Sequence, residues 1–292
     1  MRWNLSDKQD SIKARARLAL RAERAFGLRS IPVRSQPASN DLDAPAPDSP
    51  AQVAQKQVQQ SPSPTSPTDL FGNRVGPAPI PVFQSPPAFA TAPLSRDQKI
   101  AQLKVLDENE VKVCRRCRLC EQRTHTVFGE GDADARILFI GEGPGENEDL
   151  QGRPFVGRAG ELLNKWITAM GLRREQVFIA NIVKCRPPGN REPSPDEVAT
   201  CTPFLEKQIE IIRPPVIVTL GRPSAQHMLA TKNSMGRMRG HWHDWRGIKL
   251  MPTYHPAYVL RNYTYETRAA VWSDLQLVMK QLDLAIPKRE RH

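Results

Sequence analysis

The feature that most constrains the fold is a regular alternation of apolar runs with helical patterns from about residue 98 onward. Four runs are almost continuously apolar, namely ARILFIG (135–141), QVFIANIVKC (176–185), PVIVTLG (215–221) and IKLMPTYHP (248–256). Helical patterns follow them or stand between them, at 157–171, 194–213, 223–230 and 266–284. Such runs are typical of strands buried on both faces, as in parallel sheets covered by helices. The sequence therefore predicts an α/β fold of three αβα layers, with a central, mainly parallel four-stranded sheet, over residues 98–286.

The first third of the chain has a different composition and predicts no packed core. Residues 36–97 are rich in proline, glutamine and serine and hold 13 of the 27 prolines, so we expect a disordered linker. Residues 1–35 form a basic arm with a helical pattern between Ser6 and Gly27. The arm carries nine Lys and Arg against three Asp and Glu, which is more than half of the net charge of +11. It either binds DNA or a partner protein, or it is a solvated helix that keeps the chain soluble.

Five cysteines point to a metal centre. Cys114, Cys117 and Cys120 form a C-x2-C-x2-C pattern, and Cys185 and Cys201 lie further along the chain. The N-terminus lacks the apolar segment of a secretory signal, so we expect a cytoplasmic protein, nucleoid-associated in a prokaryote, with reduced cysteines. No apolar run approaches the roughly 20 residues that span a bilayer. Clustered reduced cysteines are typical of zinc and of iron–sulfur centres, and their spacing leaves both open, with five candidates for four ligand positions.

Glycine and polar residues stand at the predicted carboxyl ends of the four strands. GEGPG (141–145) follows the first strand, Asn181 lies near the end of the second, and Gly221 ends the third. His255 follows the fourth strand. Each has an ordinary alternative, such as a tight glycine turn, a solvated loop carboxylate at Glu142 or a histidine that caps a strand. Because open parallel sheets bind ligands at these strand ends, the positions together predict one cleft.

Among these residues, Asn181 is the hardest to explain without a ligand. It lies within the apolar run FIANIV, where a buried amide must be hydrogen-bonded or kept for the edge of a bound molecule.

Two other motifs carry weaker signals. In KCRPPGNREP (184–193), Arg186 and Arg191 either contact phosphates or are exposed loop charges. HWH at 241–243 places two histidines at alternate positions, as metal ligands on a β-ribbon would be. No further ligands stand nearby, so we interpret this segment as a loop and expect no metal there.

Four ordered blocks resemble the family 4 uracil-DNA glycosylases, the bacterial and archaeal type with a 4Fe-4S cluster. The blocks are CRRCRLCEQRTHTVFGEG, FIGEGPGENEDLQGRPFVGRAGELL, NIVKCRPPGNREP and TYHPAYVLR, in a resemblance that runs from Cys114 to about Leu277. The resemblance implies a DNA repair enzyme that flips uracil out of single- or double-stranded DNA. It would hydrolyse the N-glycosidic bond and leave an abasic site, and we expect it to be a monomer.

The resemblance also implies roles for residues of the predicted cleft. Glu142 would position the attacking water, Phe155 would stack on the flipped uracil, and Asn181 would read the polar edge of the base. His255 would contact uracil O2, and Glu148 stands where related families use a bulky side chain to exclude the thymine methyl group. Such an enzyme must extrude the base from the DNA and hold it with an aromatic ring and hydrogen-bonding groups.

Further implied contacts surround the base. Backbone groups around Gly141 and Gly143 would approach it, and Arg261 would contact a phosphate. The family's cluster ligands match four of the five cysteines. The family has a variable residue at the position of Cys120, so the resemblance implies that Cys120 is not a ligand. The four implied ligands are Cys114, Cys117, Cys185 and Cys201.

Departures from relatives narrow the implied activity. The covalently cross-linking relative has a nucleophilic histidine after the second strand, whereas KCRPPGNREPSPDE has none, so we expect turnover. Family 5 lacks the acidic residue that stands here as Glu142. Two alternatives stay open, namely a non-catalytic iron–sulfur protein that binds nucleic acid or recruits a partner, and a glycosylase for hypoxanthine, xanthine or mismatched bases.

Overall fold

The structure is a computed structural model that describes residues 92–287, so the expectations for the basic arm and nearly all of the linker lie outside the described residues. The described part contains six strands: β1 (Glu130–Gly131), β2 (Ile137–Gly141), β3 (Phe178–Asn181), β4 (Val216–Leu220), β5 (His243–Trp245) and β6 (Ile248–Thr253). Its α-helices are α2 (Arg96–Leu106), α3 (Glu146–Gln151), α4 (Arg158–Ala169), α5 (Pro195–Ile212), α6 (Arg222–Met228), α7 (Met235–Met238), α8 (Pro256–Arg261) and α9 (Tyr265–Gln281).

The strands form one sheet in the order β1-β3-β2-β4-β6-β5. The four central strands, β3, β2, β4 and β6, are mutually parallel, which confirms the predicted mainly parallel core of the sheet. Two short antiparallel strands, β1 and β5, extend it at its edges.

Strand β5 corrects the interpretation of HWH as a loop, because His243 begins this strand. A two-residue turn at Arg246 and Gly247, both with positive φ, joins β5 to β6 and pairs Trp245 with Ile248. This is the backbone geometry that tight hairpins favour.

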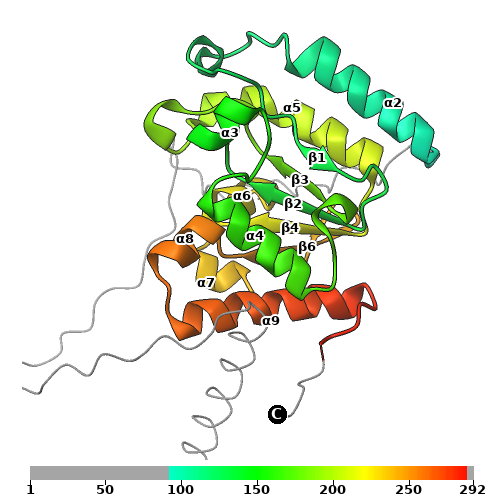
Figure 1. Cartoon of the computed structure of the whole chain (residues 1–292), viewed down its shortest axis with the longest axis vertical. Coiled ribbons are helices and arrows are strands. Elements are labelled where there is room, and N and C mark those ends of the chain that lie inside the picture. The colour runs from blue at the N-terminus through cyan, green and yellow to red at the C-terminus, as the bar shows by residue number, and fades with distance from the viewer. Residues whose placement is uncertain (1–91, 288–292) are drawn as a thin grey trace, which may run out of the picture. The chain divides into compact units, whose positions relative to one another are not determined.

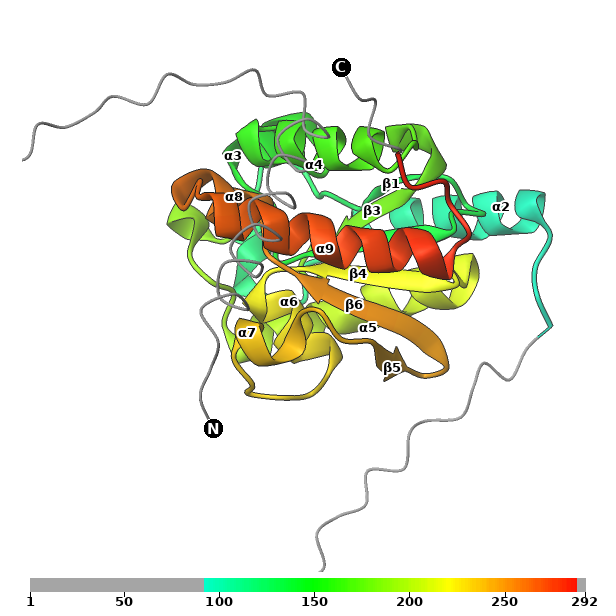
Figure 2. The same ribbon diagram turned by 90° about the horizontal axis from the view of Figure 1, so that it is seen from below.

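Helices cover both faces of the sheet, as the three-layer prediction requires. On one face, apolar side chains of β2 and β4 pack against α4 and α9, with Trp166 and Leu275 among the buried residues. On the other face, Leu138 and Ile217 pack against α5, and α2 lies over α5. Figure 1 shows α5 and α2 on one side of the sheet and α9 on the other, and Figure 2 views the sheet from the α9 side.

The predicted helices correspond to α4, α5, α6 and α9. Helix α5 begins with a capping box, in which the Ser194 backbone N–H donates to Glu197 Oε2 at 2.8 Å. Helix α2 begins at Arg96 with Ser95 as its N-cap, two residues inside the expected linker. Within the described residues, no helix combines the length and apolarity needed to cross a membrane.

Candidate functional site

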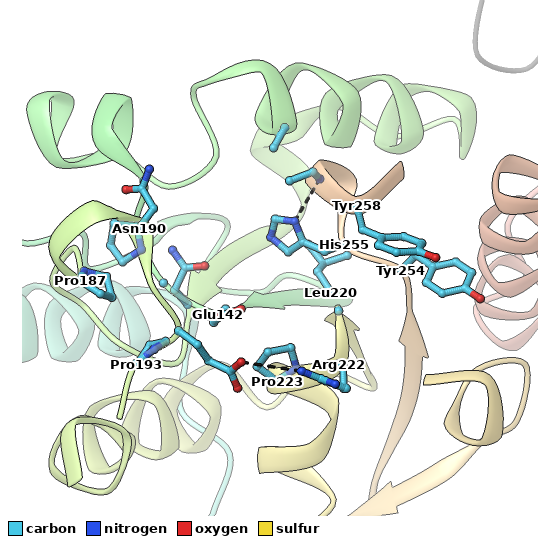
Figure 3. A pocket seen from close by; sticks show the side chains of 18 of the residues that line it. Glu142, Pro187, Asn190, Pro193, Leu220, Arg222, Pro223, Tyr254, His255 and Tyr258 are labelled. Atoms are coloured by element: carbon cyan, nitrogen blue, oxygen red, sulfur yellow. Dashed lines mark hydrogen bonds and ion pairs between the residues drawn. The ribbon is translucent and has the colours of Figure 1, made fainter. Parts of the chain in front are cut away.

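The carboxyl ends of the parallel strands open into a cleft of about 830 Å³. The residues that line it include seven of the predicted site residues: Glu142, Gly143, Glu148, Phe155, Asn181, His255 and Arg261. Figure 3 shows Pro187, Asn190 and Pro193 on one side of the cleft and His255 with Tyr254 on the other. The strand ends therefore converge as the sequence predicts.

Asn181, the last residue of β3, supplies an unpartnered amide to this cleft. It is only 1% exposed, and neither Nδ2 nor Oδ1 has a hydrogen-bond partner among the described residues. A buried polar group left unpaired costs about 1–3 kcal/mol, so the amide suits the polar edge of a ligand. Because no described side chain hydrogen-bonds this amide, packing alone determines its orientation.

Gly141 does not line the cleft itself but lies directly behind it. A Cβ at this position would be 2.3 Å from Asn181 Oδ1 and 2.6 Å from Phe155 Cζ. Only glycine lets the amide and the aromatic ring pack this close to the end of β2. Packing against Gly141 and Phe155 thus restricts the amide of Asn181.

Phe155 presents its ring to the cleft from a constrained backbone. Its φ of 50° is unusual for a non-glycine residue, and such strain persists where surrounding contacts hold it. Arg174 Nη1 donates to the Phe155 carbonyl at 3.2 Å. A Cβ at Gly160 of α4 would meet the same carbonyl oxygen at 1.8 Å, so glycine is required for this contact. The ring is preorganised, with its centroid 5.6 Å from that of His255.

Glu148 anchors the loop that carries Phe155. Its Oε1 accepts hydrogen bonds from the backbone N–H groups of Val156 at 2.9 Å and Gly157 at 3.0 Å. This anchoring contact, like that of Arg174, was missed by sequence reasoning because it joins residues of different elements. In the sequence, the only available signal was a carboxylate shortly before a glycine-flanked phenylalanine.

His255 caps α8 and points a nitrogen at the cleft. Its Nδ1 accepts a hydrogen bond from the Ala257 backbone N–H at 3.0 Å, drawn as a dashed line in Figure 3. The proton of the neutral ring is therefore on Nε2. Burial, with a smaller contribution from the charge of Arg261, lowers the pKa of His255 to about 4. The ring is therefore neutral at pH 7 and offers Nε2–H as a donor.

Glu142 directly follows β2 and lines the cleft. Burial, followed by repulsion from Glu192, raises the pKa of Glu142 to about 7, and attraction from Arg222 opposes this shift. Arg222 Nη2 lies 3.8 Å from Glu192 Oε2, the ion pair drawn at Arg222 in Figure 3. A carboxyl group with a pKa near neutrality is suited to proton transfer and to orienting water.

The two arginines of the 184–193 loop, Arg186 and Arg191, both contact groups of the protein itself. Arg191 is paired with the fully buried carboxylate of Glu197, at 2.7 Å and 2.8 Å. Arg118 donates to the same carboxylate at 2.8 Å from the cysteine-rich segment. Arg191 and, to a smaller extent, Arg118 hold the pKa of Glu197 well below its usual range despite its burial. Arg186 donates to Asn190 at 2.8 Å.

All five cysteines line one small cavity beside α5, namely Cys114, Cys117, Cys120, Cys185 and Cys201. In the described part of the chain, no three Cys, His, Asp or Glu side chains form a group that could hold a single metal ion. Burial raises the pKa of Cys185, and it raises the pKa of Cys201 to about 11. Such buried thiols ionise when a metal centre binds them.

Hydrogen bonds around these cysteines fit thiolate ligands. Arg123 Nη1 donates to Cys185 Sγ at 3.2 Å, and the Lys184 backbone N–H donates to Cys201 Sγ at 3.2 Å. N–H donors of this kind orient and stabilise metal-bound sulfur. The chemistry of the thiols and their donors therefore fits a thiolate-bound centre, whereas the described side chains do not form a single-ion site.

An aromatic ring, an unpartnered amide and a histidine thus meet at the carboxyl edge of a parallel sheet, where α/β proteins of this architecture bind their ligands. The chain belongs to the uracil DNA glycosylase superfamily, whose model matches residues 128–276, and within it to the type-4 enzymes.

Three relatives illustrate this assignment. A type-4 uracil-DNA glycosylase of Thermotoga maritima is 50% identical over 177 residues, which cover 60% of this chain and 92% of the relative. One of Saccharolobus solfataricus is 50% identical over 163 residues, 53% of this chain and 76% of the relative. A type-5 enzyme of Thermus thermophilus is only 31% identical over 179 residues, 54% of this chain and 80% of the relative.

Proposed function

The type-4 relatives establish uracil-DNA glycosylase activity in DNA repair for this chain, and we propose a role in this reaction for each residue of the cleft. The observation that carries the proposal is the buried amide of Asn181, which has no partner among the described residues and lies beside the ring of Phe155. An extruded base needs both features, a face to stack on and a polar edge to pair with.

Asn181 reads the base in this proposal. Uracil presents N3–H and O4, whereas cytosine presents N3 and an amino group, so one fixed amide satisfies uracil and mismatches cytosine. A site built to hydrogen-bond its ligand strongly rejects analogues that leave its polar groups unpaired. Phe155 stacks on the base, and Glu148 keeps the Phe155 loop in place through its two backbone hydrogen bonds.

His255 and Glu142 act on the glycosidic bond. Cleavage leaves negative charge on the departing uracil and positive charge on the sugar. The Nε2–H of neutral His255 donates to uracil O2, where the negative charge develops, and backbone N–H groups near Gly143 assist. Ionised Glu142 orients the attacking water and stabilises the cationic sugar. Water attacks directly, and no covalent intermediate with the protein forms.

We also propose that the cysteine site holds a 4Fe-4S cluster through Cys114, Cys117, Cys185 and Cys201. The fit of buried thiols with N–H donors supports a thiolate-bound centre, and the resemblance to family 4 favours iron–sulfur over zinc. When bound, the cluster would supply cross-links between the 114–120 segment and the region from 185 to 201. The chain's own Glu197 joins the same regions through Arg118 and Arg191.

The DNA contacts and the remaining segments complete the proposal. Arg261 at the cleft contacts a DNA phosphate, and the enzyme acts as a monomer on single- or double-stranded DNA in the cytoplasm or nucleoid. The basic arm of residues 1–35 adds sequence-independent affinity for DNA or binds a partner protein. Deleting residues 1–95 tests the arm, because lost phosphate contacts flatten the dependence of DNA affinity on salt.

Excision assays test the main proposal. Oligonucleotides that carry uracil, hypoxanthine, xanthine or a mismatched base, single-stranded and in duplexes, are incubated with the wild type. We expect release of uracil above the other bases, and strongly reduced release by Asn181→Ala and Glu142→Ala. Absence of uracil release by the wild type would favour the non-catalytic alternative, and dominant release of another base would favour the other glycosylase. Undiminished release by either variant would overturn its role.

A further inference from the structure

Lys184 is buried beside the cysteine cavity, although lysine is rarely buried. It is 1% exposed, and it lies three residues after Asn181 and directly before Cys185. A buried amine is tolerated where it has hydrogen-bond partners. Lys184 Nζ donates to the backbone carbonyl of Asn181 at 2.9 Å and to Gln208 Oε1 at 2.6 Å. An uncharged amine still has two N–H donors, so both bonds persist in either protonation state.

Gln208 fixes this lysine from α5. It is fully buried, its Oε1 accepts from Lys184, and its Nε2 donates to the Phe128 carbonyl at 2.9 Å. The two partners settle which amide atom is oxygen and which is nitrogen. The Val127 backbone N–H in turn donates to the Lys184 carbonyl at 2.8 Å. The lysine is therefore held at its backbone and at its amine.

The hydrogen-bonded carbonyl belongs to the residue whose side chain lacks a partner. No described residue hydrogen-bonds the side-chain amide of Asn181, so the orientation of this amide depends on packing and on the conformation of its own backbone. A donor at the carbonyl restrains the torsion of that backbone at the end of β3. Buried hydrogen bonds of this kind stabilise the fold, and buried networks restrict a site to one arrangement.

We propose that Lys184 and Gln208 are positioning residues for base recognition, which hold Asn181 at the angle that matches uracil. This inference rests on the proposed role of Asn181 as the reader of the base. A purely structural role predicts that their loss weakens folding or DNA binding in general. A positioning role predicts a loss that is confined to the base and requires Asn181.

Binding to uncleavable DNA separates these roles. One duplex carries 2′-fluoro-2′-deoxyuridine, and the other carries a tetrahydrofuran abasic analogue at the same place. The dissociation constant of the abasic duplex divided by that of the 2′-fluorodeoxyuridine duplex measures recognition of the base. We expect Gln208→Leu and Lys184→Met to lower the ratio about tenfold, the equivalent of roughly 1.4 kcal/mol, with affinity for the abasic duplex unchanged within about twofold. Gln208→Glu keeps the acceptor for Lys184 and should retain most of the ratio.

A double-mutant cycle with Asn181→Ala decides whether the effect passes through the amide. If it does, adding Gln208→Leu to Asn181→Ala changes the ratio less than about twofold. An unchanged ratio in both single variants, or the same loss with and without Asn181, overturns the inference. If Asn181→Ala alone leaves the ratio intact, the proposed role of Asn181 fails instead. Iron content and thermal unfolding identify a variant that has lost its fold, in which case the other single variant decides.

Discussion

Asn181 and Gly141 are register partners at the ends of β3 and β2, and they pack so closely that a Cβ at position 141 would lie 2.3 Å from Asn181 Oδ1. The amide is thereby confined by the neighbouring strand and not by a hydrogen bond from any described side chain. Base recognition in the proposed mechanism thus depends on the absence of a side chain next to the recognising group.

Gly141→Ala should therefore abolish excision more than it destabilises the fold. The added methyl group would overlap both Asn181 Oδ1 and Phe155 Cζ, so the amide and the ring must shift. We expect a loss of uracil excision of about 100-fold or more, since misplacing reacting groups by about 1 Å has that effect, with about 1–3 kcal/mol of stability lost. Single-turnover rates and denaturant unfolding measure the two effects.

Gly171→Ala is the matched control for this substitution. Gly171 follows α4 with a φ of 78° and has nothing within 4 Å of an added Cβ. The substitution should lower stability through backbone strain and leave the excision rate near wild type. A Gly141→Ala enzyme with wild-type rates would refute the close-packing argument.

The pH dependence of excision should report Glu142. Its folded pKa of about 7 lies above its ordinary 4.5 because of burial, so the carboxylate forms as pH rises through about 7. If the carboxylate orients the water, kcat/KM rises about tenfold per pH unit below that value and levels off above it. Glu142→Gln should be slow and lack this limb.

Glu192→Gln gives a second test of the same pKa. The charge of Glu192 raises the pKa of Glu142, so its removal should move the rising limb to lower pH. The variant also releases Arg222, which acts in the same direction. If the rising part of the kcat/KM profile stays at the same pH in Glu192→Gln, the titrating group is not Glu142.

Glu148 should tolerate glutamine but not leucine. A glutamine Oε1 can still accept from the Val156 and Gly157 N–H groups, whereas leucine leaves both unpaired. We expect Glu148→Leu to lower excision at least about tenfold by releasing the Phe155 loop, and Glu148→Gln to stay within about threefold of wild type. If exclusion of the thymine methyl group were its main role, release of thymine would instead be the effect that rises.

The cysteines should divide into four ligands and one spare. Cys114→Ser and Cys185→Ser should each lose most of the bound iron and the brown colour, whereas Cys120→Ser should keep both. Iron analysis and visible absorbance of the purified variants measure this. All five thiols line the same cavity, so Cys120 is close enough to make the outcome informative. Loss of iron from Cys120→Ser would show that the proposed ligand set is wrong.

Much of the fold could be predicted because its signals are local. Continuous apolar runs such as 137–141 indicate buried parallel strands, and the Ser194 capping box marks the start of α5. The edge strands β1 and β5 were not predicted, since two- and three-residue strands exist only through pairing with a neighbour.

The sequence by itself determined which residues stand at the strand ends, Glu142, Asn181 and His255 among them, because strand length and turn position follow from nearby residues. Only the tertiary structure decided how the groups of the site are held. Arg174 and Gly160 hold Phe155, and Lys184, itself bonded to Gln208, holds the Asn181 carbonyl. These contacts join residues far apart in the chain, and their directions depend on how the layers pack. No local pattern encodes such directions, which is why the chemistry was predictable and its positioning was not.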